Sequence, residues 1–168
     1  MKNDMSFRGQ KKGEQLVKVY FKHWISFVRP VLVFLPFLLV SMTILYYQAL
    51  LGTLILSLGF LIFLVGLSYL TYHFLIWRWD VYILTNYRVI NFDQRTLFHR
   101  VVSEAELVNV QDTTYEVKGI WQTIFNYGQV NILTASSGEN ICFRDVANPQ
   151  MVQALIVSVK DKKDQTKD

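Results

Sequence analysis

Between Val31 and Trp77 the sequence is VLVFLPFLLVSMTILYYQALLGTLILSLGFLIFLVGLSYLTYHFLIW, which contains no Asp, Glu, Lys or Arg. The hydrocarbon core of a bilayer is about 30 Å thick, and a helix that rises about 1.5 Å per residue needs roughly 20 apolar residues to cross it. The stretch is too long for one crossing and long enough for two. It predicts a membrane α-helical hairpin over residues 31–77, with spans at about 31–48 and 51–77.

The orientation of this hairpin is predicted by the charges around it. Residues 1–29 hold seven Lys or Arg against two Asp or Glu, a balance of +5, whereas the connection from Tyr46 to Gly52 is uncharged. Cytoplasmic segments beside membrane spans are enriched in Lys and Arg, so both termini are expected in the cytoplasm. The sequence therefore predicts a multi-pass protein of the cell (inner or plasma) membrane.

Basic and Trp side chains near the ends of the spans are expected at the membrane interface, where both are enriched. They are Lys18, Lys22, Trp24, Arg29, Trp77, Arg78 and Trp79. Residues 78–168 hold ten Lys or Arg against eleven Asp or Glu, a balance of −1, so the basic excess lies beside the membrane. This distribution favours membrane lipids, and not nucleic acid, as the charged partner.

The segment before the first span has two competing interpretations. Residues 1–30 form a basic cytoplasmic segment in which polar residues at 15, 18, 22, 26 and 29 have helical spacing, which favours an in-plane amphipathic helix over residues 14–29. The alternative is a strand, because Val17, Val19 and Phe21 alternate with Lys18, Tyr20 and Lys22.

Small residues recur along the second span. Gly52, Gly59 and Gly66 are spaced by seven residues, which suggests a seam that packs the two spans together or supports self-association through the hairpin. The alternative is that Gly is simply common in membrane helices.

After Arg78 the sequence changes to short β-type runs, which predicts a soluble domain over residues 78–160. The expected strands are 79–84, 87–92, 97–102, 107–110, 113–117, 129–135 and 140–144, with a helical turn at 119–125. Asn148 and Pro149 are typical of a helix start, and Leu155 and Ile156 are expected on the buried face of that last helix. The charged tail 161–168 is expected to be disordered. The fold class is a membrane α-helical hairpin plus an α+β, mainly-β soluble domain: a small half-open β-barrel capped by a C-terminal helix.

The order of several short motifs resembles the bacterial pleckstrin-homology (PH)-like membrane proteins, the YdbS-like group formerly described as a domain of unknown function. The matching pieces are Gly13-Glu14, His23-Trp24, the two spans, Leu84–Ile90, Val108–Asp112, Lys118–Ile120, Tyr127–Ile132 and Asn148-Pro149. The resemblance covers about residues 13–160 and implies a PH-like barrel on the cytoplasmic side, without enzyme activity.

The residues themselves show no pattern typical of a catalytic site, a cofactor site or a metal site. His23, His73 and His99 are scattered, and there is no HExxH, CxxC, phosphate-binding Gly loop or GxSxG. The single cysteine, Cys142, lies in an apolar run and is expected to be a buried structural thiol. The protein is therefore expected not to be an enzyme.

Three function classes follow from these features. The preferred hypothesis is a non-enzymatic, membrane-anchored module that docks a protein partner at the cytoplasmic membrane surface. The alternative is a sensor of the anionic lipid surface or a structural membrane organiser, for which Arg88, Arg95 and Arg100 form a possible basic strip. An enzyme or transporter is disfavoured, because two spans with almost no polar groups provide no pathway by themselves.

Overall fold

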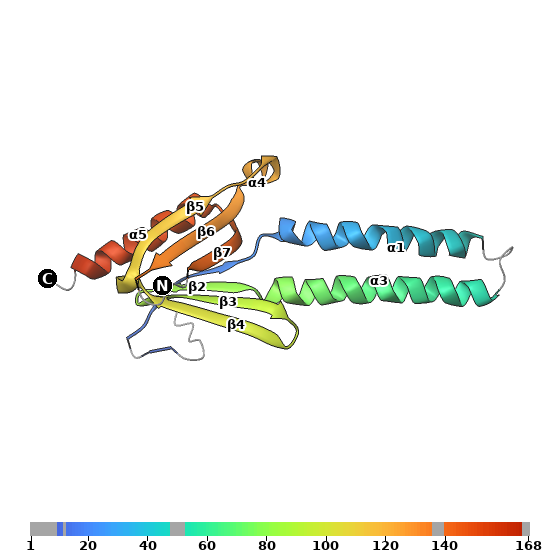
Figure 1. Ribbon diagram of the computed structural model, residues 1–168, viewed down its shortest axis with the longest axis horizontal. Coiled ribbons are helices and arrows are strands. Elements are labelled where there is room, and N and C mark those ends of the chain that lie inside the picture. Colours follow the sequence, from blue (N-terminus) through green and yellow to red (C-terminus); the bar gives the residue numbers. More distant parts are fainter. Residues whose placement is uncertain (1–9, 12, 48–52, 136–139, 166–168) are drawn as a thin grey trace. The chain divides into compact units, whose positions relative to one another are not determined.

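The computed structural model describes residues 10–11, 13–47, 53–135 and 140–165. It divides into two compact units, one formed by the chain up to His23 together with the chain from Trp79 onward, and the other by Trp24–Arg78. The first unit contains two antiparallel sheets (Figure 1). The four-stranded sheet has the order β1 (Leu16–Phe21), β2 (Val81–Thr85), β3 (Arg88–Thr96), β4 (His99–Glu106), and the three-stranded sheet the order β5 (Val110–Glu116), β6 (Tyr127–Thr134), β7 (Ile141–Ala147).

Strand β1 corrects the expectation of an amphipathic helix over residues 14–29. Leu16–Phe21 is a strand that pairs with β2 in an antiparallel register, and a 3-10 turn, η1 (Trp24–Phe27), follows it. The alternating interpretation was the right one, because the backbone groups of this segment are satisfied by a strand that lies far away in sequence. As a result, residues on both sides of the apolar stretch belong to one domain.

The two ends of this domain can be told apart from the chain connections. Phe21, the last residue of β1, is opposite Val81, the first residue of β2, so the chain leaves for the helices and returns from them at the same end of the sheet. We call this the junction end. The β2–β3 turn and the short η2 (Leu107–Asn109) lie at the opposite, far end.

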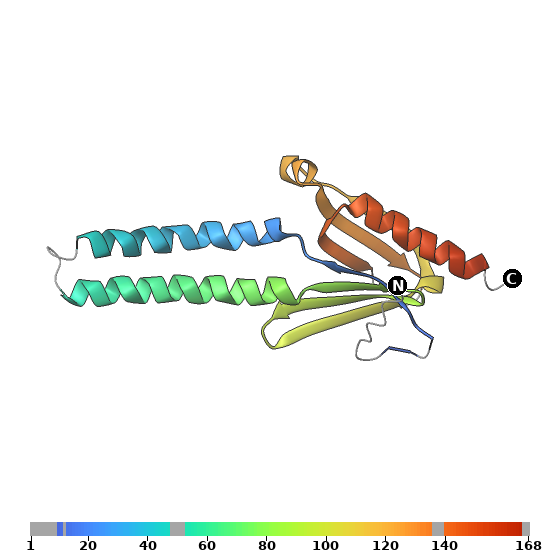
Figure 2. The same cartoon turned by 180° about the vertical axis from the view of Figure 1, so that it is seen from behind.

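The core lies between the two sheets and under the last helix. Leu84, Val130 and Phe143 are fully buried, and α5 (Pro149–Gln165) adds the fully buried Ile156. Leu155 is only partly buried against the same cluster. Figure 2 shows α5 lying across the three-stranded sheet, where it contacts β5 and β6. The predicted half-open β structure closed by a C-terminal helix is confirmed.

Helix α5 continues beyond its expected end. The tail from residue 161 was expected to be disordered, whereas α5 extends to Gln165; residues 166–168 lie outside the described residues. Long side chains hold this last part to the domain. Lys160 Nζ donates to the carbonyl oxygen of Val110 at 2.7 Å, and Lys163 Nζ donates to that of Tyr87 at 3.3 Å. Lys160 and Lys163 are three residues apart and lie on one side of the helix, so both reach carbonyl oxygens of the domain. The charged composition of this segment did not indicate these contacts.

The second unit consists of η1, α1 (Val28–Tyr46) and the first 26 residues of α3 (Thr53–Trp79), up to Arg78. α1 and α3 are long and apolar enough to cross a membrane, by length and composition. They pack in antiparallel directions through the small residues of α3. A Cβ atom on Gly59 would lie 2.8 Å from Ile44, and one on Gly66 would lie 2.7 Å from Phe37. The glycines therefore allow close packing of the two helices against each other; Gly52 and the uncharged connection lie outside the described residues.

Most other side chains of these helices are exposed or only partly buried in the described structure. Only about a tenth of each candidate span, 11%, is buried within the described structure. Exposed members include Leu39, Met42, Phe60, Leu61 and Val65. A soluble protein rarely shows such a large apolar surface, so the pair is suited to a hydrocarbon environment.

Candidate binding surfaces of the domain

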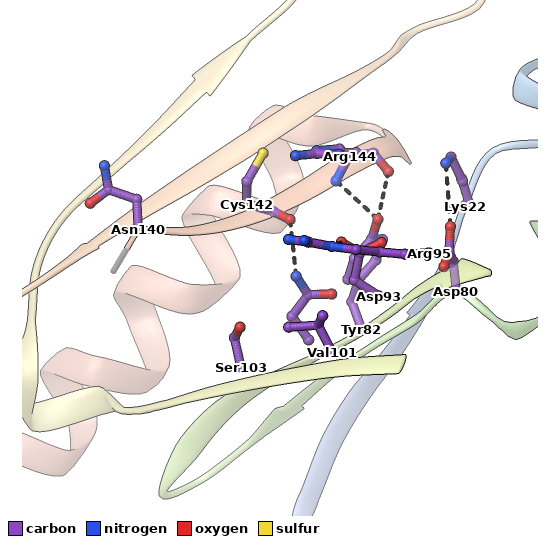
Figure 3. Close-up of a pocket in the computed structure, with 11 residues that line it drawn as sticks. Lys22, Asp80, Tyr82, Asp93, Arg95, Val101, Ser103, Asn140, Cys142 and Arg144 are labelled. Carbon is purple, nitrogen blue, oxygen red and sulfur yellow. Dashed lines mark hydrogen bonds and ion pairs between the residues drawn. The ribbon is translucent and has the colours of Figure 1, made fainter. Parts of the chain in front are cut away.

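A polar cleft lies between the two sheets of the domain (Figure 3), with a volume of about 120 Å³. Its lining comes from the inner face of β2, β3 and β4 on one side and from β7 on the other. The lining residues are Lys22, Asp80, Tyr82, Asn91, Asp93, Arg95, Val101, Ser103, Asn140, Cys142 and Arg144. Three cations and two carboxylates line this small space, so it can offer both hydrogen-bond donors and acceptors to a polar group.

The charged groups at the junction end of the cleft form ion pairs with one another. Lys22 Nζ lies 3.3 Å from Asp80 Oδ2 and 4.0 Å from Asp145 Oδ2. Asp80 Oδ1 accepts a hydrogen bond from the backbone N–H of Gln94 at 2.8 Å. Burial raises the pKa of Asp80, although Lys22 and the Gln94 N–H act in the opposite direction. Lys22 lies before the helical unit, and Asp80 and Asp145 lie after it, so these contacts join the two parts of the domain. The backbone of Lys22 also forms an antiparallel bridge with Val146 of β7.

Uncharged groups form the middle of the cleft. Asn91 Nδ2 donates to the carbonyl oxygen of Cys142 at 3.3 Å, whereas the buried Asn91 Oδ1 has no hydrogen-bond partner among the described residues. Tyr82 OH donates to the carbonyl oxygen of Arg144 and accepts from its N–H, both at 3.0 Å. Burial raises the pKa of the half-buried Cys142 thiol, so this cysteine is a poor nucleophile at neutral pH.

A buried ion pair occupies the far end of the four-stranded sheet. Arg88 Nε and Nη2 donate to the two oxygens of Glu14 at 2.9 and 3.1 Å, and Arg88 Nη1 donates to Glu104. Thr85 Oγ1 donates to Glu14 as well, at 2.8 Å. Burial alone would raise the pKa of Glu14, but the hydrogen bonds from Arg88, the Lys11 N–H and Thr85 outweigh it and lower that pKa.

This pair corrects the suggested basic strip. Arg88 is buried and neutralised, so it does not act with Arg95 and Arg100, which lie toward the junction end of β3 and β4. Arg95 is paired with Asp93 at 3.6 Å, and Arg100 Nε donates to Gln94 Oε1 at 2.9 Å. The sequence did not reveal the burial of Arg88, because its partner Glu14 lies on the other side of the apolar stretch.

The residues expected at the membrane interface fall in both units. Lys18 is exposed on β1, whereas Lys22 is partly buried in the cleft, which makes it a structural cation in this domain. Trp24 and Arg29 are exposed at the start of the helical unit, and Trp77 packs against Phe27. Arg78 and Trp79 end α3 and are both exposed. Their contact with a membrane surface stays a prediction.

The described part of the chain shows no cluster of side chains typical of a catalytic or metal site. No group of three or more His, Cys, Asp or Glu residues within it is arranged to hold a metal ion. His23 stacks on Tyr127 at a ring distance of 5.1 Å, and burial lowers the pKa of His23 despite the nearby Asp145. His23 therefore packs against β6 as a structural residue of the domain.

The chain is similar to a known protein family and to two solved structures. The family model described as Bacterial PH domain matches residues 30–160. Two solved structures are similar over 48% of this chain. The first is a DUF1696 family protein with a pleckstrin-homology domain from Shewanella loihica PV-4, with 14% identity, 70% of that chain covered and a TM-score of 0.37. The second is a pleckstrin-homology domain from Shewanella amazonensis SB2B, with 16% identity, 74% of that chain covered and a TM-score of 0.35. No curated protein matches the sequence. Because the family model matches well over half of the residues, the chain belongs to the bacterial PH domain family.

Proposed function

We propose that this protein is a non-enzymatic module, anchored in the cell membrane by α1 and α3, whose PH-like domain docks a protein partner at the cytoplasmic membrane surface. The observation that carries the proposal is the insertion of the helical unit between two paired strands. β1 and β2 are neighbours in one sheet, and only Asp80 separates the end of α3 from the start of β2. The anchor and the domain are thus joined without a flexible linker.

The shared sheet also restricts the membrane topology. If the helices cross a bilayer, β1 and β2 must both lie on the same side of it, since their backbones are hydrogen-bonded to each other. This requires an even number of crossings, in agreement with two candidate spans. The excess of Lys and Arg before the first span favours the cytoplasm as that side. The order of sequence motifs further supports a place in the YdbS-like group.

The outer edge of β4 is the surface we assign to the partner. β4 is the last strand of its sheet and borders the polar cleft through Val101 and Ser103. An edge strand offers backbone N–H and C=O groups to an extended segment of another protein. The edge of β5 is less suited, because Gln153 and Lys160 of α5 already donate to the carbonyl oxygens of Thr113 and Val110. We therefore expect an extended peptide segment to add to β4.

Two changes test the proposal in cells. A flexible Gly/Ser stretch inserted after Arg78 should weaken co-purification of the partner, because the domain is then no longer held close to the membrane. Val102→Lys on β4 should abolish co-purification, since a lysine on an edge strand opposes the addition of another strand. The matched control is Val108→Lys, which changes an exposed valine of η2 outside that edge. Equal recovery of the same proteins by all four chains, wild type included, would contradict the proposal.

A second candidate function is sensing of an anionic lipid surface. The specific observation in its favour is that Arg95 and Arg100 flank the β3–β4 turn at the junction end. If no protein depends on β4, and the full-length protein instead changes its domain mobility with the headgroup composition of vesicles, the lipid function is the better description.

A further inference from the structure

Two segments at the surface of the PH-like domain expose large apolar side chains. Phe98, in the turn between β3 and β4, is 99% exposed, with Leu97 beside it. The short helix α4 (Ile120–Ile124), between β5 and β6, exposes Ile120 at 75%, Trp121 at 68% and Ile124 at 65%. We call these segments the β3–β4 tip and the α4 tip. A single exposed apolar residue needs no explanation, but the cluster on α4 does, and so does a phenylalanine as fully exposed as Phe98 beside the partly exposed Leu97.

The β3–β4 tip lies at the junction end of the domain. Val81, the first residue of β2, is opposite Phe92, and β3 continues past Phe92 to Thr96 before the turn. The tip therefore extends beyond the point at which the chain enters β2. Trp79, the last residue of α3, lines one surface depression together with Leu97, Phe98 and Arg100.

The α4 tip lies at the same end. After Phe125 and Asn126 the chain reaches Tyr127 at the start of β6, and the ring of Tyr127 stacks on His23, which follows β1. Figure 1 shows the β3–β4 turn and α4 at one end of the two sheets, with the C-terminal end of α5 at the other. Both apolar tips therefore project from the end at which the chain passes to the helices.

Charges flank each tip in a pattern suited to a lipid interface. Arg95 and Arg100 bracket the β3–β4 tip, and Lys118 precedes the α4 tip. Arg95 pairs with Asp93 at 3.6 Å and Lys118 with Glu116 at 2.6 Å, but the side chains of both cations remain mostly exposed. Apolar and Trp side chains enter the boundary between headgroups and acyl chains, while nearby Lys and Arg side chains remain at the level of the phosphates. A protein partner would not require both tips to lie at the junction end, whereas a membrane would.

We propose that the β3–β4 and α4 tips insert into the interface of the same bilayer that α1 and α3 span. The inference rests on the proposed membrane anchoring. Only Asp80 separates α3 from β2, so a membrane-spanning α3 keeps Trp79, and the residues around it, near the bilayer surface. Insertion at two tips, in addition to the covalent junction, fixes the tilt of the domain. The β4 edge then points in one constant direction for its partner.

Depth-dependent fluorescence quenching in the full-length protein tests this inference. The protein carries Cys142→Ala and one new cysteine, is labelled with an environment-sensitive dye, and is reconstituted into vesicles of phosphatidylcholine and phosphatidylglycerol. Some vesicles also contain lipids that carry a nitroxide quencher near the headgroup, and others contain lipids that carry it in the acyl chain. The test positions are Phe98→Cys and Trp121→Cys, both exposed, so neither change removes a core contact. Val108→Cys is the control at the far end, and Phe60→Cys, an exposed position in the first third of α3 and inside the candidate span, reports the span.

We expect the headgroup nitroxide to quench the dyes at positions 98 and 121 severalfold more strongly than the dye at 108, and the acyl-chain nitroxide to quench the dye at 60. If 60 is quenched and 98 and 121 behave like 108, the tips stay in water and the inference is overturned, while membrane anchoring stands. If 60 is not quenched at all, the proposed anchoring fails and the inference fails with it. Tips that become shielded only when a protein is added would also overturn the inference in favour of a protein-binding surface.

Discussion

Phe21 and Val81 are opposite residues in the β1–β2 ladder, and the whole apolar helical pair lies between them in the sequence. The domain therefore cannot complete its four-stranded sheet until both helices have been made. Pairing residues so distant in sequence carries a loop-closure cost, which α1 and α3 reduce by packing against each other. The helical pair is thus an insertion in the fold of the domain, and the domain in turn holds both ends of the pair together.

The ion pair between Glu14 and Arg88 should be a major contribution to the stability of the domain. Glu14→Gln leaves the buried guanidinium of Arg88 without its bidentate partner. Removal of one member of a buried pair costs about 3–5 kcal/mol of unfolding free energy, and the low end of that range is expected because Arg88 keeps its contact with Glu104. The control is Glu106→Gln, which breaks the exposed Lys11–Glu106 pair and should cost at most about 1 kcal/mol. Unfolding of the full-length protein in detergent, followed by near-ultraviolet circular dichroism, gives both values.

The same pair predicts a pH dependence. The pKa of Glu14 in the folded state lies below its ordinary value of 4.5, so the ionised carboxylate stabilises the fold above that pH. As the pH falls below 4.5 toward the folded-state pKa, this contribution is lost. The stability difference between wild type and Glu14→Gln should therefore narrow on acidification. A difference that stays constant from neutral pH to pH values well below 4.5 would show that Glu14 is not the titrating group.

Ile156 of α5 should be the side chain through which the last helix closes the domain. It is fully buried, so Ile156→Ala should lower the unfolding free energy by about 2–5 kcal/mol. Val157→Ala, one position along the same helix and exposed, should change it by no more than about 0.5 kcal/mol. Equal thermal unfolding midpoints for the two variants would mean that α5 does not cover the core.

The glycines of α3 should be required for the packing of the two helices. Gly66→Leu would place a Cβ atom 2.7 Å from the Phe37 side chain, so the helices must move apart, at a cost of about 1–3 kcal/mol. Leu61→Ala, at an exposed position of α3, serves as the comparison. Thermal loss of helical circular dichroism in detergent should occur at a lower temperature for Gly66→Leu than for Leu61→Ala. The reverse order would place the helix contact elsewhere.

The sequence predicted those features that depend on local pattern. The apolar stretch from Val31 to Trp77 indicated two spans by length alone, and the Asn148-Pro149 start indicated the last helix. The strand β1 was harder to predict, because Leu16–Phe21 satisfies both a helical and an alternating pattern, and only pairing with β2 decides between them. The expected strands 87–92 and 97–102 put the β3–β4 turn too early, at Asp93–Arg95. β3 runs through these residues to Thr96, because cross-strand pairing overrides the turn propensity of Asp93.

Residues of the candidate surfaces were predicted less well than the fold. Arg88 looked like an exposed strand arginine, but its burial depends on Glu14 from before the helices. Lys22 was expected at the membrane interface, whereas Asp80 and Asp145 draw it into the polar cleft. The apolar residues of the α4 tip were recognised as a helical turn, yet their exposure could not be predicted, because the same spacing is typical of a core-facing turn.

Cysteine accessibility across the membrane shows whether the helical pair is a membrane insertion between two strands of one cytoplasmic domain. In a Cys142→Ala background, single cysteines replace Lys18 before the helices, Gln48 between them and Lys162 after them. Intact cells are treated with a membrane-impermeant maleimide. We expect labelling of position 48 alone, with positions 18 and 162 labelled only after the cells are lysed. If position 18 or position 162 were labelled from outside the cell without the other, β1 and β2 could not share a sheet, and the helical pair would not be an insertion in one domain.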